Sequence, residues 1–330
     1  MYGPSDISVV VPVGNGSPRA AGVVGRVLSA SPPPGEVVVV DDAVSDGSLD
    51  GLPADERVRV VANGRGRGPA GARNAGAEAA AKDIILFIDA DVFVPRDIFA
   101  RLTEAYGDAV DAVLGVEAES ADLPNFASRY KNLWMRFTYL ILPRQVGLFY
   151  TSCASIKKDV FWAAGGFDES YKVPSVEDTA FGRALGARGA RVVLEKDIEV
   201  EHRKTYGTKE ALVTAFRRGA ALARCVLRAG RRPGGNRTSV PTSFIASLPL
   251  AALFVLWAAL APFFWKLAVV GAAATLAAIY IFNVKWLAFL GRRGPAMTLG
   301  ALFFLPLELA FGLGGGAWGT ASYYLLKRRY

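Results

Sequence analysis

DIILFIDADVFVP, residues 83–95, joins a run of apolar residues to two aspartates, Asp89 and Asp91. Residues 83–89 lack the polar alternation of a half-exposed strand, so we expect a strand that is buried on both faces. Strands of this kind belong to parallel sheets covered by helices, whose ligands bind beyond the carboxyl ends of the strands. The segment therefore predicts an α/β sheet with a ligand site at Asp89 and Asp91.

The same pattern of short apolar runs and helical segments occurs before residue 83. Strand and helix alternate there as in a mainly parallel, Rossmann-like sheet. Asp41 and Asp42 end one of the apolar runs, so we expect them at the same crevice as Asp89 and Asp91. The strands are expected at 7–13, 36–42, 58–62 and 83–89, and the helices at 17–30 and 69–82.

Residues 126–150, FASRYKNLWMRFTYLILPRQVGLFY, interleave aromatic and basic side chains. We expect an interfacial helix here, with Trp134 presenting an acceptor at a membrane; packing in the protein core is an equally good interpretation. Regular patterns return with a helix at 177–189 and a strand at 190–202.

Nearly every stretch from Ser243 onward is apolar. Three successive apolar stretches each provide at least the ~20 positions that cross a ~30 Å hydrocarbon core. Three transmembrane spans are therefore the simplest count, and buried core helices are the alternative. Glycines at 312 and 314–316 would break the third span into a hairpin if the basic tail stays in the cytoplasm. The expected organisation is a catalytic domain at 1–205, a basic juxtamembrane segment at 206–242 and a transmembrane domain at 243–330, with spans at 243–263, 267–288 and 297–326.

The net charge of +8 is concentrated next to the apolar stretches. Basic residues beside a membrane segment attract anionic lipid headgroups, and this placement favours lipid over nucleic acid as the partner. The arginines before the first apolar stretch are Arg217, Arg218, Arg224, Arg228, Arg231, Arg232 and Arg237.

The two cysteines, Cys153 and Cys225, are far apart and form no CxxC motif. Neither a disulfide framework nor a cysteine metal site is indicated, which fits a reducing compartment. The first residues, MYGPSDISVVVPV, lack the pattern of a signal peptide and are interpreted as the first strand. We therefore expect a multi-pass plasma-membrane protein whose catalytic domain faces the cytoplasm.

Asp89 and Asp91 are hard oxygen ligands of the kind that bind Mg²⁺ or Mn²⁺ together with substrate phosphates. His202 is the only histidine and follows a predicted strand, so it is a candidate third ligand. A solvated acidic turn and a structural histidine are the alternative interpretations.

Glu177 and Asp178 are adjacent acids at the start of a predicted helix. Either could act as a general base towards an acceptor hydroxyl, and a favourable interaction with the helix dipole is the alternative. The glycine-rich loop before Arg73 could hold phosphate. Its Gly66, Gly68 and Gly71 match GxGxxG, but the match follows the third predicted strand, and this position argues against a dinucleotide fingerprint.

Six motifs in order resemble the inverting family 2 glycosyltransferases: VVVPVGN, VVVVDDAVSDGS, GPAGARNAG, FIDADVF, GGFDE and VEDTAFGRAL. The resemblance implies a GT-A fold, a divalent metal (Mn²⁺ or Mg²⁺) and a nucleotide-sugar donor, with UDP expected from family habit. By the same resemblance Asp178, beside Glu177, is the catalytic base. The implied donor residues are Pro12, Val13, Asn15, Asp41, Asp42, Arg73, Asp89 and Asp91, the metal ligands are Asp91, Asp89 and His202, and the acceptor side contains Gly166, Phe167, Asp168, Glu177 and Trp134.

The expected activity is transfer of a sugar to a hydroxyl of a lipid or lipid-linked acceptor, with inversion. DADVF stands where polyprenyl-phosphate sugar synthases usually carry DADLQ, and this difference favours a hydroxyl over a lipid phosphate. Two alternatives remain open, a polyprenyl-phosphate glycosyltransferase and a non-catalytic membrane scaffold.

Overall fold

The structure is a computed structural model that describes residues 2–328 apart from 67, 108, 120–121 and 230–239. Arg231, Arg232 and Arg237 lie outside the described residues. The chain forms two compact units. The first contains the described residues of 1–122 and 139–204, and the second those of 123–138, 205–229 and 240–328.

Four parallel strands form one half of a mixed sheet in the first unit, in the order β3-β2-β1-β4. These are the four strands that the apolar runs predict, although β2 and β4 end one or two residues earlier than expected. The apolar residues of β4 are completely buried, as the lack of alternation indicates. The strands are β1 (Ile7–Val13), β2 (Glu36–Asp41), β3 (Val58–Ala62) and β4 (Ile84–Phe87).

The other half of the sheet contains β9, which the sequence predicts as the strand at 190–202, and further strands that the sequence patterns do not predict. Strand β8 pairs antiparallel with β4 and β6, and β6 pairs in parallel with β9. The last residue of β9, His202, pairs with Val92 of the short strand β5. These strands are β5 (Val92–Phe93), β6 (Ala112–Glu117), β7 (Gln145–Val146), β8 (Ala154–Lys157) and β9 (Val192–His202).

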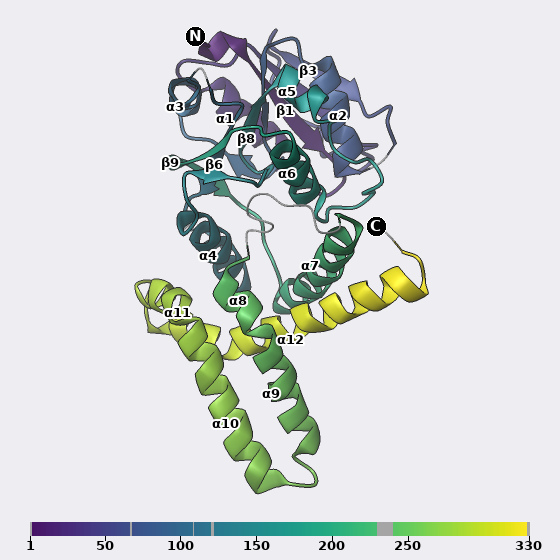
Figure 1. The fold of residues 1–330 in the computed structure, drawn as a ribbon. Coiled ribbons are helices and arrows are strands. Elements are labelled where there is room, and N and C mark those ends of the chain that lie inside the picture. The colour runs from purple at the N-terminus through teal and green to yellow at the C-terminus, as the bar shows by residue number, and fades with distance from the viewer. Residues whose placement is uncertain (1, 67, 108, 120–121, 230–239, 329–330) are drawn as a thin grey trace. The chain divides into compact units, whose positions relative to one another are not determined.

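Helices cover both faces of this sheet (Figure 1). The face that contains Val9 and Val11 packs against α1 and α3. On the other face, Gly76 of α2 is so close to Val10 that an added Cβ would lie 2.3 Å from that side chain, so this position requires glycine. The helices of the first unit are α1 (Ala20–Leu28), α2 (Pro69–Ala79), α3 (Ile98–Ala105), α5 (Lys158–Ala163) and α6 (Glu177–Ala187), after a short 3₁₀ turn, η1 (Pro4–Asp6).

The second unit is helical. Three stretches of its described residues are long and apolar enough to cross a membrane: Thr242–Leu260, Trp265–Phe282 and Pro295–Leu325. Its helices are α4 (Phe126–Leu140, whose last two residues belong to the first unit), α7 (Thr208–Ala229), α8 (Thr242–Ala246), α9 (Leu248–Leu260), α10 (Trp265–Phe282), α11 (Val284–Gly291) and α12 (Pro295–Leu325).

The glycines of the third apolar stretch do not break it. Helix α12 continues through 312–316, so the expectation of a hairpin there is wrong. These glycines instead allow α7 to approach closely: a Cβ on Gly315 would lie 2.0 Å from the carbonyl oxygen of Phe216. Backbone contact between α7 and α12 is the reason for the small residues.

An aromatic cluster joins α4 to the helices that follow residue 240. Trp134 is buried in it, with its ring centroid 4.7 Å from that of Phe244 and 5.2 Å from that of Trp286. The Trp134 side chain therefore packs in the core of the second unit. Of the two interpretations that the sequence allowed, core packing agrees with this position.

Candidate active site

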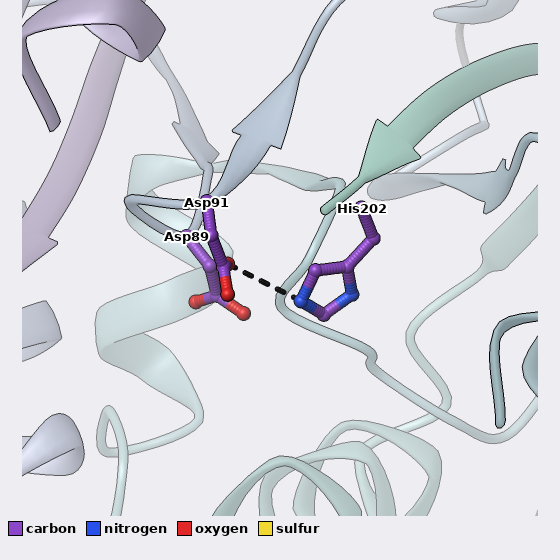
Figure 2. Close-up of side chains that lie close together, drawn as sticks. All are labelled: Asp89, Asp91 and His202. Carbon is purple, nitrogen blue, oxygen red and sulfur yellow. Dashed lines mark ion pairs between the residues drawn. The ribbon is translucent and has the colours of Figure 1, made fainter. Parts of the chain in front are cut away.

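Asp89, Asp91 and His202 meet at the carboxyl end of the sheet, as Figure 2 shows. One ligand atom from each of the three side chains lies within 4.8 Å of the others. The backbone explains this meeting, because Val92 pairs with His202 and the Arg203 amide donates to the Asp91 carbonyl over 2.9 Å. Two carboxylates and an imidazole are a donor set that fits Mn²⁺, and the carboxylates fit Mg²⁺ as well.

His202 lies between two carboxylates. Its Nε2 is 3.2 Å from Asp91 Oδ1, and its Nδ1 is 2.8 Å from Glu117 Oε1. Burial on its own would lower the pKa of His202, but Glu117 and Asp91 raise that pKa well above its ordinary value. Burial on its own would raise the pKa of Asp91, because it disfavours the charged carboxylate. The hydrogen bond from His202 outweighs this effect and brings the pKa of Asp91 below its usual value.

The sequence patterns do not identify Glu117 or its partner Tyr150. The Tyr150 hydroxyl donates a 2.6 Å hydrogen bond to Glu117 Oε1, the same oxygen that lies 2.8 Å from His202 Nδ1. Glu117 ends the apolar run 112–116, just as Asp41 and Asp89 follow apolar runs. The signal was therefore present, but the strand that carries it went unpredicted.

Arg73 joins two of the predicted acids. Its buried guanidinium lies 2.7 Å from Asp89 Oδ1 and 3.1 Å from Glu177 Oε1. Glu177 is itself buried and also accepts a 2.9 Å hydrogen bond from the Ser175 amide. Arg73 Nε has no hydrogen-bond partner among the described groups, which leaves a donor available at the site.

Asp178 has different surroundings from its neighbour Glu177. It is partly exposed at the first turn of α6, and its Oδ1 accepts a 2.6 Å hydrogen bond from the Thr179 amide. The two adjacent acids are thus distinguished by burial: Glu177 is held by a buried cation, and Asp178 is accessible to solvent.

The predicted donor residues lie around the ends of β1 and β2. Asp42 accepts hydrogen bonds from Asn63 Nδ2 over 2.7 Å and from the Gly68 amide over 3.0 Å. Gly68 has φ +126°, and a Cβ there would lie 2.7 Å from the Lys172 carbonyl oxygen, so the loop requires this glycine. Pro12 and Val13 end β1, Asp41 accepts from the Val44 amide over 2.8 Å, and Asn15 accepts from the Ser45 amide over 2.8 Å.

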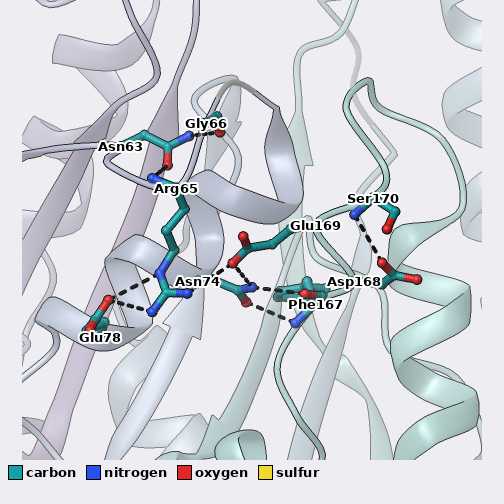
Figure 3. A network of polar contacts seen from close by, with 9 residues as sticks. All are labelled: Asn63, Arg65, Gly66, Asn74, Glu78, Phe167, Asp168, Glu169 and Ser170. Carbon is teal, nitrogen blue, oxygen red and sulfur yellow. Dashed lines mark hydrogen bonds and ion pairs between the residues drawn. The ribbon is translucent and has the colours of Figure 1, made fainter.

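Helix α2 holds the glycine loop of residues 165–169 (Figure 3). Asn74 donates to the Phe167 carbonyl over 2.9 Å and accepts from the Phe167 amide over 2.9 Å. It also donates to Glu169 Oε1 over 2.8 Å. Gly166 has φ +66°, and the Phe167 ring is buried. Asp168 turns away from this network and accepts from the Ser170 amide over 3.0 Å.

Comparisons with known proteins show which family the first part of the chain resembles. Residues 8–165 match the family described as Glycosyl transferase family 2. The chain is 31% identical over 211 residues to a pre-mycofactocin glycosyltransferase of Mycobacterium tuberculosis, covering 61% of this chain and 43% of that protein. It is 31% identical over 142 residues to an undecaprenyl-phosphate 4-deoxy-4-formamido-L-arabinose transferase of Pectobacterium carotovorum, covering 40% of this chain and 43% of that protein.

The chain thus spans about two fifths of the length of either relative. Among solved structures, a mannosyltransferase of Pyrobaculum calidifontis in complex with GDP-Man and Mn²⁺ has the same fold, with a TM-score of 0.60, 19% identity, and coverage of 99% of this chain and 89% of that one. Together with the mixed GT-A-like sheet, the match shows that this chain carries a glycosyl transferase family 2 domain at residues 8–165.

Proposed function

We propose that this chain is a metal-dependent, inverting glycosyltransferase that moves a sugar from a nucleotide-diphosphate donor to a hydroxyl of a lipid or lipid-linked acceptor. The observation that carries the proposal is the meeting of Asp89, Asp91 and His202 within 4.8 Å at the carboxyl end of the sheet. In parallel α/β sheets this is the edge at which ligands bind.

Asp89, Asp91 and His202 would hold the metal, and a bound Mn²⁺ or Mg²⁺ would stabilise the charge that develops on the diphosphate leaving group. Arg73 fixes the orientation of Asp89 through the 2.7 Å ion pair, and its unpartnered Nε provides a donor for a phosphate oxygen. Pro12, Val13, Asn15, Asp41 and Asp42 lie at the ends of β1 and β2, where they would contact the nucleoside.

Asp178 is the proposed catalytic base. It takes the proton from the acceptor hydroxyl while that oxygen displaces the nucleoside diphosphate at the anomeric carbon, so one displacement inverts the configuration and needs no covalent glycosyl intermediate. Its partial exposure supports this role over Glu177, whose carboxylate is occupied by Arg73. On the acceptor side, Gly166 and Asp168 fit better than Phe167 and Trp134, because both of these rings are buried.

The proposed location is the plasma membrane, with the family 2 domain on the cytoplasmic side, where nucleotide sugars are made. Three apolar helices and the arginines of α7 support membrane attachment and contact with anionic headgroups. A lipid or lipid-linked acceptor follows from this attachment.

Transfer to a lipid phosphate is the second candidate, because one of the relatives is named as an undecaprenyl-phosphate sugar transferase. The two products differ chemically, since a sugar on a lipid phosphate is a glycosyl phosphate that mild acid hydrolyses, whereas a sugar on a hydroxyl is a glycoside that survives this treatment. Mild acid treatment of the radiolabelled lipid product therefore distinguishes the two acceptors.

The deciding experiment is transfer by the detergent-purified full chain from UDP-, GDP- and dTDP-sugars to extracted membrane lipids, with Mn²⁺, Mg²⁺ or EDTA. One donor should be consumed, EDTA should stop the reaction, and Asp91→Ala and Asp178→Asn should each abolish it. Glu201→Gln is the matched control, because Glu201 is on the same strand as His202 but pairs with Arg203. If folded protein consumes none of these donors, the proposal is wrong.

A further inference from the structure

Helix α12 has one exposed apolar face and one covered face. Phe303, Phe311 and Trp318 are exposed, and their spacing of eight and seven residues places them on the same side of the helix. Ala301 and Leu305, two residues before and after Phe303 and so on the opposite side of the helix, are buried, as are Glu308 and Gly315. The location of α12 relative to the lipid therefore depends on which helices pack against its covered face.

Helix α7 covers the C-terminal half of α12. The two helices run in the same direction, because Phe216 lies against Gly315, Ala220 against Gly319, and Arg224 donates a 3.2 Å hydrogen bond to Ser322 Oγ. Neighbours in such close backbone contact lie at the same depth in a membrane. The arginines of α7 are Arg217, Arg218, Arg224 and Arg228.

Four arginines on one helix are strongly unfavourable in the hydrocarbon core but favourable among anionic headgroups. Helix α7 consequently belongs at the surface of the bilayer. Since α12 lies along it, the second half of α12 belongs there too.

Helix α4 covers the first half of α12. Lys131 Nζ lies 2.8 Å from Glu308 Oε1, and the Tyr130 hydroxyl donates to Glu308 Oε2 over 3.0 Å. The same helix carries Arg129, which is exposed, and Arg136. A helix with this many cations also belongs outside the hydrocarbon core.

The other two apolar stretches contact α12 near the ends at which the chain enters and leaves them. The Tyr280 hydroxyl, two residues before the end of α10, donates to the Leu302 carbonyl over 2.7 Å. Ala251, near the start of α9, belongs to the same apolar cluster as Ala301 and Leu305. Helix α12 thus crosses one end of the α9–α10 pair, as Figure 1 also shows within this unit.

We infer that α12 lies in the plane of one membrane leaflet, with its exposed apolar face among the acyl chains and α7 among the headgroups. Two stretches, Thr242–Leu260 and Trp265–Phe282, then cross the bilayer instead of three. At about 28 Å and 27 Å, by the 1.5 Å rise per residue, each is long enough for a ~30 Å core.

An even number of spans places the basic ends of the chain on one side. Arg292, Arg293, Lys327 and Arg328 then share a side with the arginines of α7, as cytoplasmic positive charge requires. Three spans would separate Lys327 and Arg328 from the rest. This inference does not depend on the proposed catalytic activity.

The test uses the full chain in liposomes of zwitterionic and anionic phospholipid, with Cys153 and Cys225 replaced by alanine. One spin label is placed at Phe303→Cys, Phe311→Cys or Trp318→Cys, and its depth is measured from its accessibility to oxygen and to a water-soluble nickel complex. The three sites span about 22 Å along the helix axis at 1.5 Å per residue. Labels at Leu267→Cys, Val270→Cys and Ile281→Cys on α10 provide the matched control.

The inference predicts nearly equal, shallow depths on α12 and depths that vary along α10. It is overturned if the α12 labels pass through the midplane. A second readout is a cysteine added after Tyr330: a membrane-impermeant thiol reagent should reach it from the same side as Arg292→Cys. Labelling from opposite sides would restore three spans.

Discussion

Glu117 Oε1 lies 2.8 Å from His202 Nδ1, the ring nitrogen that does not face Asp91. A carboxylate in this position fixes the orientation of the imidazole and favours a proton on Nδ1, which leaves Nε2 for a metal. The hydrogen bond from Tyr150 holds Glu117 in turn over 2.6 Å. Metal affinity should therefore depend on a carboxylate that does not touch the ion.

Glu117→Gln should weaken Mn²⁺ binding by at least about tenfold, because partners of this kind contribute ~10- to 100-fold to metal affinity. The measurement is the electron paramagnetic resonance signal of unbound Mn²⁺ during a titration. Glu201→Gln removes the same charge from an exposed ion pair one residue before His202 and should leave the affinity unchanged. Equal affinities for the two variants would contradict a role for Glu117.

Glu177→Gln and Asp178→Asn should have different effects. Glu177 is one of two carboxylates that pair with the buried Arg73, and Asp89 remains after the substitution, so the variant should lose only part of the about 3–5 kcal/mol of a fully broken buried pair and unfold at lower temperature. Asp178→Asn should retain the parent's unfolding midpoint but lose transfer by about 10²–10⁴-fold, the size of a general-base contribution. Thermal unfolding and turnover number, measured side by side, check both; a stable, inactive Glu177→Gln would reverse the assignment.

Burial raises the pKa of the Cys153 thiol to about 12 from its ordinary 9.0. The thiolate is then favoured in the unfolded chain, so the stabilisation is complete below pH 9 and is lost as the pH rises towards 12. Between pH 7 and pH 10 the parent should lose about 1 kcal/mol more stability than Cys153→Ala, by the 1.36 kcal/mol per pKa unit. Denaturant unfolding at the two pH values measures the difference, and equal losses would show that the thiol ionises normally.

Much of the fold follows from local sequence, but the second half of the sheet, apart from β9, does not. Strands β1, β2 and β4 are continuous apolar runs that are buried along most of their length, so the sequence predicts them closely, whereas β3, at the edge of the sheet, is predicted although it is partly exposed. Strands β5 and β7 have two residues each, and only pairing with β9 makes them strands. Long-range pairing of this kind leaves no local periodicity.

Contacts between distant parts of the sequence also explain what could not be predicted of the site and of the glycines. Asp89 and Asp91 follow an apolar strand and could be predicted, whereas Glu117 follows a run whose partners were unknown. Gly315 appeared to be a helix breaker because its sequence does not reveal that α7 lies against it. A glycine can end a helix or allow a second helix to pack closely, and only the presence of the second helix distinguishes the two roles.

Gly315→Ala and Gly316→Ala should have opposite effects on stability. A Cβ on Gly315 would lie 2.0 Å from the Phe216 carbonyl oxygen, whereas one on Gly316 meets nothing within 4 Å. Alanine favours a helix over glycine by about 1 kcal/mol, so Gly316→Ala should be neutral or stabilising and Gly315→Ala destabilising. Thermal unfolding in one detergent tests the pair; two similar shifts would contradict the close contact of α7 and α12.

Removing one partner of the ion pair between Lys131 and Glu308 should lower the stability of the protein strongly, whereas replacing both partners should lower it little. Both side chains are buried, and Lys131 Nζ lies 2.8 Å from Glu308 Oε1. Glu308→Gln leaves a buried ammonium without its counter-charge, which should cost about 3–5 kcal/mol. Replacing both residues, with Lys131→Met and Glu308→Gln, should recover most of this loss, because no uncompensated charge remains and the Tyr130 hydroxyl keeps an acceptor.

The exposed pair of Arg101 and Asp97 is the control, and its single variants should change stability by less than about 1 kcal/mol. If the double variant is as unstable as the single one, packing at Glu308 and not its charge stabilises the second unit.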